Sequence, residues 1–214
     1  TKHAFYFEFL DKAADRFANP TTAINQLWQT DFTYLKIIGW GWFYLSTVLD
    51  DFSRYIVAWK LCTTMAASDV TDTLHLALQA SGLDQAEVDC RPRLLSDNGP
   101  SYVANDLADW LKGQGMRHTR GKPYNPMPPG KIERWHLSLK SRILLENYFL
   151  PGDLERAVSD FVEHYNHCRY HESLDNLTPA DVYFGRGDRI LKRREDIKRR
   201  TIDLRRRQHF NAAA

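Results

Sequence analysis

Cysteine is scarce in this sequence, and the positions of its few cysteines exclude two ways of stabilising a small domain. The three cysteines among 214 residues, Cys62, Cys90 and Cys168, lie far apart, and no two have the spacing of a zinc ribbon. Neither a disulfide framework nor a cysteine zinc ribbon is therefore predicted, and a reducing cytoplasm is the compartment that fits best. Long apolar runs are missing as well. None approaches the roughly 18 residues that span a bilayer, so no membrane partner is expected.

An initial methionine is also absent, because the chain starts at Thr1. We expect it to be a piece of a longer protein. Residues 1–26 mix aromatic and charged positions without a clear period, and Asn19-Pro20 marks a break within them. This segment is predicted to be a linker or the remnant of an upstream domain. The rest of the chain is long enough for one folded domain with a sizeable core.

The net charge is only +2, but it is unevenly distributed. Between Arg186 and Arg207 there are eleven Lys or Arg and four Asp or Glu, which leaves an acidic body and a basic tail. Within the tail Ile190, Ile197 and Leu204 recur every seven residues. That seam suits a helix that docks on a partner subunit or on DNA. A solvated helix or a disordered tail remains an alternative.

The remaining pattern predicts an α/β fold. Runs rich in β-branched and aromatic residues predict strands, and apolar positions at helical spacing predict helices between and after them. Ser68 and Asp153 are the predicted N-caps of two helices. The order of elements favours a mixed sheet with helices packed on it. Strands are predicted at 27–35, 42–49, 54–62, 93–96 and 116–119, and helices at 68–81, 105–113, 131–146 and 153–167.

Three carboxylates stand at positions that point to metal chemistry. Asp31 lies inside the first predicted strand, Asp97 where a later strand meets a turn, and Glu133 in the first turn of a helix. Strands are depleted in Asp, so Asp31 requires a reason to be there. Carboxylate oxygens are the ligands of Mg²⁺ and Mn²⁺, and a pair of such ions can serve phosphodiester chemistry. The alternative is a capping Asp, a turn Asp and a surface Glu.

The local sequences around these acids resemble the catalytic core of DDE-class retroviral-type integrases and bacterial insertion-sequence transposases. The resemblance extends from Gln26 to Phe184, and 35 residues separate Asp97 from Glu133, as in that family. The matching pieces are Trp-Gln-Thr-Asp-Phe-Thr around Asp31, Asp-Asp-Phe-Ser-Arg-Tyr at 50–55, Ser-Asp-Asn-Gly-Pro around Asp97, Gly-Lys-Ile-Glu-Arg-Trp-His around Glu133, Tyr-Asn-x-x-Arg-x-His-x-Ser-Leu at 165–174 and Thr-Pro-Ala at 178–180.

The resemblance implies a ribonuclease-H-like fold, a five-stranded mixed sheet flanked by helices in which the second strand is antiparallel to its neighbours. It implies a catalytic core at residues 27–184, followed by a basic helical tail at 185–214. Asp31, Asp97 and Glu133 would hold two Mg²⁺ or Mn²⁺ ions. Water would attack first to free a 3′-hydroxyl, which would then attack a second DNA strand without a covalent protein–DNA intermediate.

The resemblance also implies partners and DNA contacts. The expected partners are transposon ends, target DNA and further copies of the same chain, in a bacterial cytoplasm at the nucleoid. In relatives a basic residue at the position of Lys140 contacts DNA near the cut. Lys131, Arg134 and His136 on the same predicted helix are further candidate DNA-binding residues.

One segment departs from the family. Residues 125–130 read Asn-Pro-Met-Pro-Pro-Gly, where relatives carry polar side chains and fewer prolines. Proline fixes φ and removes an amide donor. Pro128 and Pro129 could start the Glu133 helix early and preorganise the site. We expect instead a loop held away from DNA and reduced joining activity.

Three other readings remain. The chain could be a ribonuclease-H-like nuclease that only hydrolyses, or a catalytically weakened DNA-binding or assembly module derived from a transposase. The third is a zinc site, because His164, His167, Cys168 and His171 have the spacing of one helix face. Zinc is disfavoured because the helix is expected to end before His171.

Overall fold

The computed structural model describes residues 21–85, 91–120 and 130–212. It contains two compact units, with the boundary between Leu154 and Glu155, and each is treated separately below. The predicted linker at 1–20, Cys90 and the proline-rich segment at 121–129 lie outside the described residues.

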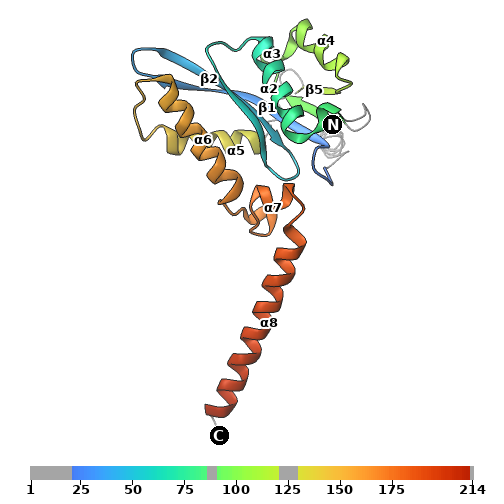
Figure 1. The fold of residues 1–214 in the computed structure, drawn as a ribbon, viewed down its shortest axis with the longest axis vertical. Helices are drawn as coiled ribbons and strands as arrows, with labels where there is room; N and C mark the ends of the chain where they lie inside the picture. Colours follow the sequence, from blue (N-terminus) through green and yellow to red (C-terminus); the bar gives the residue numbers. More distant parts are fainter. Residues whose placement is uncertain (1–20, 86–90, 121–129, 213–214) are drawn as a thin grey trace, which may run out of the picture. The chain divides into compact units, whose positions relative to one another are not determined.

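The first unit is built on the five-stranded sheet that the sequence predicts (Figure 1). The spatial order is β3-β2-β1-β4-β5. β2 runs antiparallel to both β1 and β3, whereas β1, β4 and β5 run parallel to one another. The expected ribonuclease-H-like arrangement is thereby confirmed. The strands are β1 (Leu27–Ile37), β2 (Gly41–Asp50), β3 (Ile56–Cys62), β4 (Arg93–Ser96) and β5 (His118–Arg120).

Two predicted strands begin two residues too early, and each for a local reason. β3 begins at Ile56 rather than at 54, because Arg54 has a φ of 64° in a turn closed by its amide on the carbonyl of Asp50. β5 begins at His118 rather than at 116. The amide of Met116 donates to the carbonyl of Leu111, which ties this residue to the end of the preceding helix.

Helices α2 (Ala67–Ser81), α3 (Pro100–Val103), α4 (Asn105–Gly113) and α5 (Gly130–Ile143) complete the first unit, with a 3-10 turn at Leu83–Gln85. Ser68 is not the cap of α2 as predicted. The helix starts one residue earlier, and the carboxylate of Asp69 accepts a hydrogen bond from the amide of Ala66. The apolar faces of these elements meet in one core, which removes their side chains from water. Its fully buried members include Trp28, Leu45, Leu74, Leu94, Leu107, Ile132 and Leu139.

The second unit holds most of α6 (Pro151–His167), the 3-10 turn Glu172–Leu174, α7 (Pro179–Tyr183) and α8 (Gly187–Ala212). α6 starts at Pro151, so Asp153 lies in its first turn and is not the predicted N-cap. The helix ends at His167, before His171, as expected.

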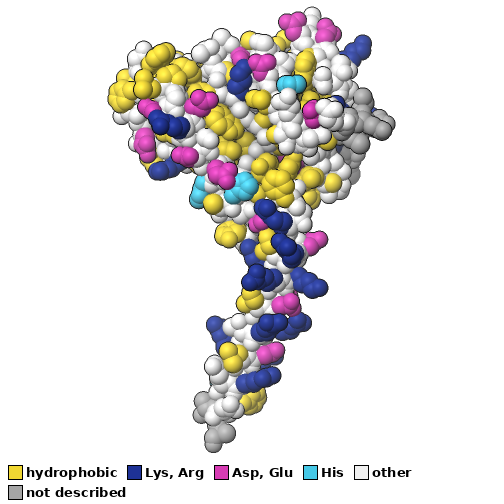
Figure 2. Space-filling view, viewed as in Figure 1, with side chains coloured by type: hydrophobic (Ala, Val, Ile, Leu, Met, Phe, Trp, Pro, Cys, Tyr) yellow, Lys and Arg dark blue, Asp and Glu magenta, His cyan; other side chains and the backbone are white. Residues whose placement is uncertain are grey.

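The basic tail is helical, and its side chains are largely exposed, with Lys and Arg along its length (Figure 2). Near its start, Arg194 donates to the carbonyls of Asp175 and Asn176. Although α8 is long, none of the helices described here has the apolar length required to cross a membrane.

Candidate active site

Asp31 and Asp97 come together through the register of two parallel strands. Gln29 of β1 pairs with Leu95 of β4, and each aspartate lies two residues beyond its member of that pair. The two acids are therefore at the same level along the strand direction, where β4 ends, and neighbouring strands of a sheet lie about 4.8 Å apart. Asp31 is partly exposed and Asp97 is exposed, so both carboxylates can meet a ligand from solvent.

The hydroxyl of a buried tyrosine interacts electrostatically with both carboxylates. Tyr102 on α3 is 4% exposed, and its ring lies 6.1 Å from that of Phe32. Burial raises the pKa of the Tyr102 hydroxyl well above its usual value, and the negative charges of Asp31 and Asp97 raise this pKa further. One hydroxyl thus lies within electrostatic reach of both acids, which supports the proximity inferred from the register.

Backbone amides orient the two carboxylates. The amide of Phe32 donates to Oδ1 of Asp31 at 2.8 Å, and the amide of Gly99 donates to Oδ1 of Asp97 at 2.8 Å. A Cβ at Gly99 would lie 3.0 Å from that Asp97 oxygen. Glycine in the Asp-Asn-Gly sequence therefore allows the backbone to approach the carboxylate.

A polar network fixes the start of α5 against β1. The amide of Ile132 donates to Oε1 of Gln29 at 3.1 Å. Nε2 of Gln29 in turn donates to Oδ1 of Asp51 at 2.7 Å. Nζ of Lys131 lies 2.8 Å from Oδ2 of Asp51 and 2.7 Å from its carbonyl oxygen. Three segments distant in sequence, β1, the β2–β3 turn and α5, therefore share one set of hydrogen bonds.

The charge state of Asp51 reflects this network. Burial acts to raise the pKa of its carboxyl, but hydrogen bonds from Lys131 and Thr21 and the charge of Lys131 outweigh burial. The pKa is consequently lowered, and Asp51 is ionised at neutral pH. The preceding Asp50 is buried and holds the β2–β3 turn by accepting from the amide and hydroxyl of Ser53.

Glu133 lies between two attachments of α5 to β1. The first is Ile132 on Gln29, and the second is His136, whose Nδ1 is 3.5 Å from Oδ2 of Asp31. His136 is 7% exposed and faces this acid, so its predicted DNA contact stays a prediction. Glu133 itself is exposed on the first turn.

Glu133 does not complete a metal-binding group in this conformation. Within residues 21–85, 91–120 and 130–212, no three His, Cys, Asp or Glu side chains lie close enough to hold a metal ion. The helix is attached to β1 on both sides of Glu133, through the amide of Ile132 on Gln29 and through His136 beside Asp31.

The other predicted DNA-binding residues have different surroundings. Arg134 is exposed, and Nζ of Lys140 lies 4.1 Å from the centre of the Tyr34 ring. The ammonium of Lys131 is bound by Asp51 and only 33% of its side chain is exposed. In the sequence Lys131 and Lys140 look alike, as basic residues of one helix. In the structure Lys131 pairs with the carboxylate of Asp51, whereas Lys140 lies over the ring of Tyr34.

Sequence reasoning assigned no role to Gln29, Asp51 or Tyr102. Gln29 and Asp51 lie in two pieces of the family resemblance, and this was the only signal that could have marked them. Their contacts with α5 depend on pairings across about a hundred residues, which local patterns do not specify.

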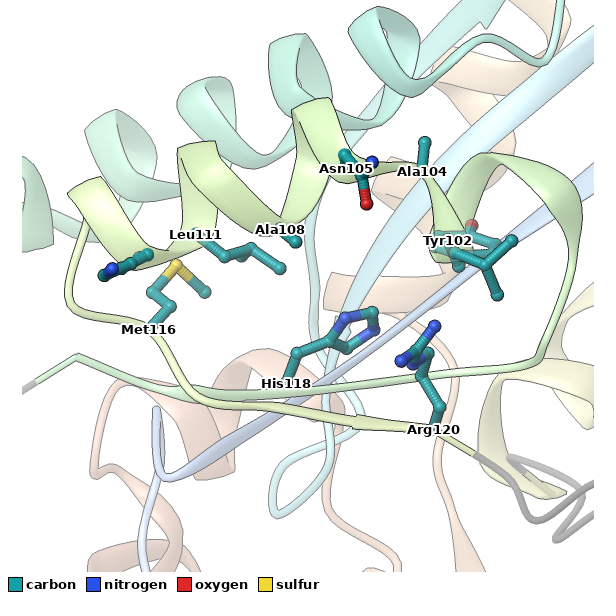
Figure 3. A pocket seen from close by; sticks show the side chains of 10 residues that line it. Tyr102, Ala104, Asn105, Ala108, Leu111, Met116, His118 and Arg120 are labelled. Atoms are coloured by element: carbon teal, nitrogen blue, oxygen red, sulfur yellow. The ribbon is translucent and has the colours of Figure 1, made fainter.

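A pocket of about 380 Å³ lies between α4 and β5 (Figure 3). Nε2 of His118 lies 2.8 Å from the hydroxyl oxygen of Ser96, the residue before Asp97. Burial, aided by the charge of Arg120, lowers the pKa of His118 to about 4, so the ring is neutral at neutral pH. The pocket therefore gains no charge from this histidine. Its lining includes Tyr102, Asn105, Leu111, Met116, His118 and Arg120.

Two solved structures show the same fold. The HTLV-2 integrase catalytic core domain in complex with magnesium aligns with a TM-score of 0.61 and 18% identity, covering 77% of this chain and 99% of that one. A simian T-cell lymphotropic virus intasome in complex with PP2A regulatory subunit B56 gamma aligns with a TM-score of 0.66 and 24% identity, covering 77% and 56%.

Curated relatives are bacterial transposases. The chain is 28% identical over 164 residues to the transposase for insertion sequence element IS904 of Lactococcus lactis subsp. lactis (strain IL1403), covering 75% of this chain and 62% of that protein. It is 29% identical over 160 residues to transposase InsF for insertion sequence IS3A of Escherichia coli (strain K12), covering 72% and 52%. The chain thus spans little more than half the length of these relatives.

Two family models, both described as integrase core domain, match residues 21–126 and 114–179. Between them they cover β1 to β5, α5, α6 and the residues Thr178 and Pro179 at the start of α7. The segment that carries Asp31 and Asp97 and the segment that carries Glu133 are therefore matched in the expected order. The chain belongs to the integrase core domain family, alongside bacterial insertion-sequence transposases.

Proposed function

We propose that the chain is the catalytic core of a DDE-type DNA transposase that cleaves and joins phosphodiesters with two Mg²⁺ or Mn²⁺ ions. The observation that most supports this proposal is the pairing of Gln29 with Leu95, from which we infer that Asp31 and Asp97 lie level on neighbouring segments. The attachment of α5 to β1 through Ile132, the residue before Glu133, supports it further. The family membership supports this reading. The choice of ion is supported by the similar HTLV-2 integrase core domain, which forms a complex with magnesium.

The donor chemistry at the site fits such ions. Asp31, Asp97 and Glu133 offer hard carboxylate oxygens that are open to solvent, and these suit Mg²⁺ or Mn²⁺. When bound, two such ions lower the pKa of an attacking water and stabilise charge on the attacking and leaving oxygens.

The protein's own residues perform the remaining tasks. Backbone amides at Phe32 and Gly99 orient the aspartates. The Gln29–Asp51–Lys131 network fixes the first turn of α5, which carries Glu133, against β1. DNA is held by cations that reach the surface of α5, with the exposed Arg134 and the half-buried Lys140 as the proposed contacts. No side-chain nucleophile is required, because water attacks in the first step and a DNA 3′-hydroxyl in the second.

The proposed partners are transposon ends, target DNA and further copies of the chain. The related viral structure is an intasome, which makes an oligomer on DNA the expected working form. The division into a segment at 1–26, a catalytic core at 27–184 and a basic tail at 185–214 is part of the proposal, as is a location at the bacterial nucleoid.

A cleavage assay on labelled DNA tests the function. With Mg²⁺ or Mn²⁺ the protein should nick the DNA and join the freed 3′-end to a second duplex, and a chelator should stop both reactions. Hydrolysis without joining would assign the chain to a nuclease. DNA binding without either reaction would assign it to an assembly module, and both results would contradict the proposal.

Removal of the tail should change the salt dependence of DNA binding. Each phosphate contact contributes roughly 0.9 to the slope of log affinity against log salt, so a chain ending at Phe184 should show a slope reduced by several units. The full chain with Arg205, Arg206 and Arg207 changed to Gln keeps α8 and should show a smaller reduction. Binding isotherms across salt concentrations measure both. An unchanged slope in both variants would assign the tail to protein contacts.

A further inference from the structure

Aromatic and cationic side chains lie together on β1, β2 and α5, with Tyr34, Lys36 and Trp42 exposed and Lys140 half-buried. Tyr34 and Trp42 are 56% and 54% exposed, and their rings meet edge to face at 5.4 Å between centres. Nζ of Lys140 lies 4.1 Å from the Tyr34 ring centre, and Nζ of Lys36 lies 5.9 Å from the Trp42 ring centre. We call Lys36, Tyr34, Trp42 and Lys140 the aromatic–cationic surface.

The sheet register explains why these side chains are neighbours. Lys36 and Trp42 are directly paired across the β1–β2 hairpin, and Tyr34 lies diagonally from Trp42 on the same face. Other residues on this face that lie nearer to Asp31 are covered, since Thr30 is fully buried and Phe32 packs near Tyr102. The exposed part therefore begins immediately beyond the covered acid-bearing end of the strand.

The aromatic–cationic surface lies close to Asp31 along β1 and to Glu133 along α5. Tyr34 is three residues beyond Asp31 on β1, about 10 Å along the strand, and the two side chains leave opposite faces of β1. Lys140 is seven residues beyond Glu133 on a helix, which is also about 10 Å. Both elements thus lead from the catalytic acids to the same place, at a distance of about three stacked nucleotides.

The positive charges of Lys36 and Lys140 indicate a negatively charged partner for this surface. Both ammonium groups lie on ring faces, and no ion pair with a carboxylate holds either lysine within the described part of the chain. A cation on an exposed ring is attracted only weakly, so both ammonium groups keep donors for a second partner. Exposed aromatic faces beside basic side chains are the combination that binds unpaired nucleic-acid strands.

We propose that the aromatic–cationic surface binds the unpaired DNA strand next to the reacting phosphate. Lys36 and Lys140 contact phosphates, and Tyr34 and Trp42 contact bases that have left the duplex. This proposal rests on the proposed function and extends it, because it gives the DNA strand a path and adds Lys36, Tyr34 and Trp42 to the contact at Lys140.

Binding to labelled duplexes tests the surface without catalysis. One duplex ends in a short unpaired overhang and the other is blunt, and a chelator is present throughout. Wild-type protein should bind the overhang duplex more tightly. Trp42→Leu should remove this preference, with a loss of about fivefold or more on the overhang duplex and little change on the blunt one. Unchanged preference in Trp42→Leu would overturn the base contact.

Charge substitutions test the phosphate contacts. Lys36→Gln should reduce the salt slope by roughly 0.9, whereas Lys36→Arg should keep it. Lys60→Gln is the matched control, because Lys60 is held by Asp72 at 2.6 Å on β3 and should leave the slope unchanged. Equal slopes in Lys36→Gln and wild type would overturn the proposal.

Two further measurements separate this proposal from its alternatives. Light scattering without DNA reports self-association. If Trp42→Leu and Lys36→Gln change the oligomeric state but not DNA affinity, the surface belongs to a second copy of the chain and the proposal is wrong. Cleavage by wild-type protein is scored separately. If wild-type protein cleaves DNA but neither substitution changes DNA affinity, the proposed function stands and only the proposed role of this surface is wrong.

Discussion

Asp31→Asn and Asp97→Asn are each expected to abolish metal-dependent cleavage and joining while the fold is kept. Each substitution keeps the size of the side chain but replaces a charged ligand oxygen by an amide. Loss of one metal ligand removes about 4 kcal/mol or more of transition-state stabilisation, which is about a thousandfold in rate. Initial rates of nicking on labelled DNA measure the effect.

The controls for this prediction are stability and an unrelated acid. Both carboxylates reach solvent and accept one backbone amide each, so Asp97→Asn should change thermal unfolding little. Asp31 also lies 3.5 Å from Nδ1 of His136, so Asp31→Asn should lower the unfolding temperature slightly while the fold is kept. Asp109→Asn on the exposed face of α4 removes the same charge away from the site and should cleave like wild type. Cleavage within tenfold of wild type by either active-site variant would remove that aspartate from the catalytic set.

Glu133→Gln completes the series. Its side chain is exposed, and the attachments of α5 run through Ile132 and His136 instead. Activity should therefore be lost without a change in unfolding temperature. Retained activity would show that the helix presents a different residue to the metal ions.

Sequence predicted the elements of this fold well because their signals are local. The alternation of β1 and β2 and the helical spacing of α2 and α4 depend on near neighbours. The errors fall where a distant or backbone contact decides the boundary. Met116 leaves β5 because of its hydrogen bond to Leu111, and Ser68 loses the cap of α2 because Asp69 reaches back to Ala66.

The candidate site shows the same division. Its three acids could be named from motif and spacing, but the support beneath them could not. Lys131 looked like one more member of a basic helix, and only the folded chain shows its ammonium on Asp51, 80 residues away. A charge in a sequence carries no information about which opposite charge it meets. The proline-rich segment, where the strongest departure from relatives lies, falls outside the described residues.

Removal of either partner in the Asp51–Lys131 pair should lower both stability and catalysis. Asp51 is 11% and Lys131 33% exposed at the side chain, so the pair is partly shielded from water. Asp51→Asn or Lys131→Met leaves hydrogen-bonding groups of Gln29 or Asp51 incompletely satisfied. We expect a loss of about 1–3 kcal/mol in the free energy of unfolding for each. Lys60→Met, at a more exposed pair, should cost less than about 1 kcal/mol.

The double variant shows whether the pair acts as a unit. If it does, Asp51→Asn with Lys131→Met should cost less than the two single losses together, with a coupling of about 0.5–3 kcal/mol. Urea unfolding measures the cycle, and nicking rates at saturating DNA show whether turnover falls in parallel. Lys131→Arg, which keeps the charge and the donors, should recover most of both.

The dependence of stability on pH at acidic pH is an independent test of the Asp51–Lys131 pair. The folded pKa of Asp51 lies below its ordinary value of 3.8, so its stabilisation is complete above that pH and is lost as the pH falls through the folded pKa. Asp51→Asn lacks this carboxyl, so its stability should approach that of wild type as the pH falls below about 4. If the stability gap between the two proteins stayed constant down to strong acid, the carboxylate charge would not be what holds α5. In that case the position of Glu133 would depend on the contacts of Ile132 with Gln29 and of His136 with Asp31, together with packing of α5.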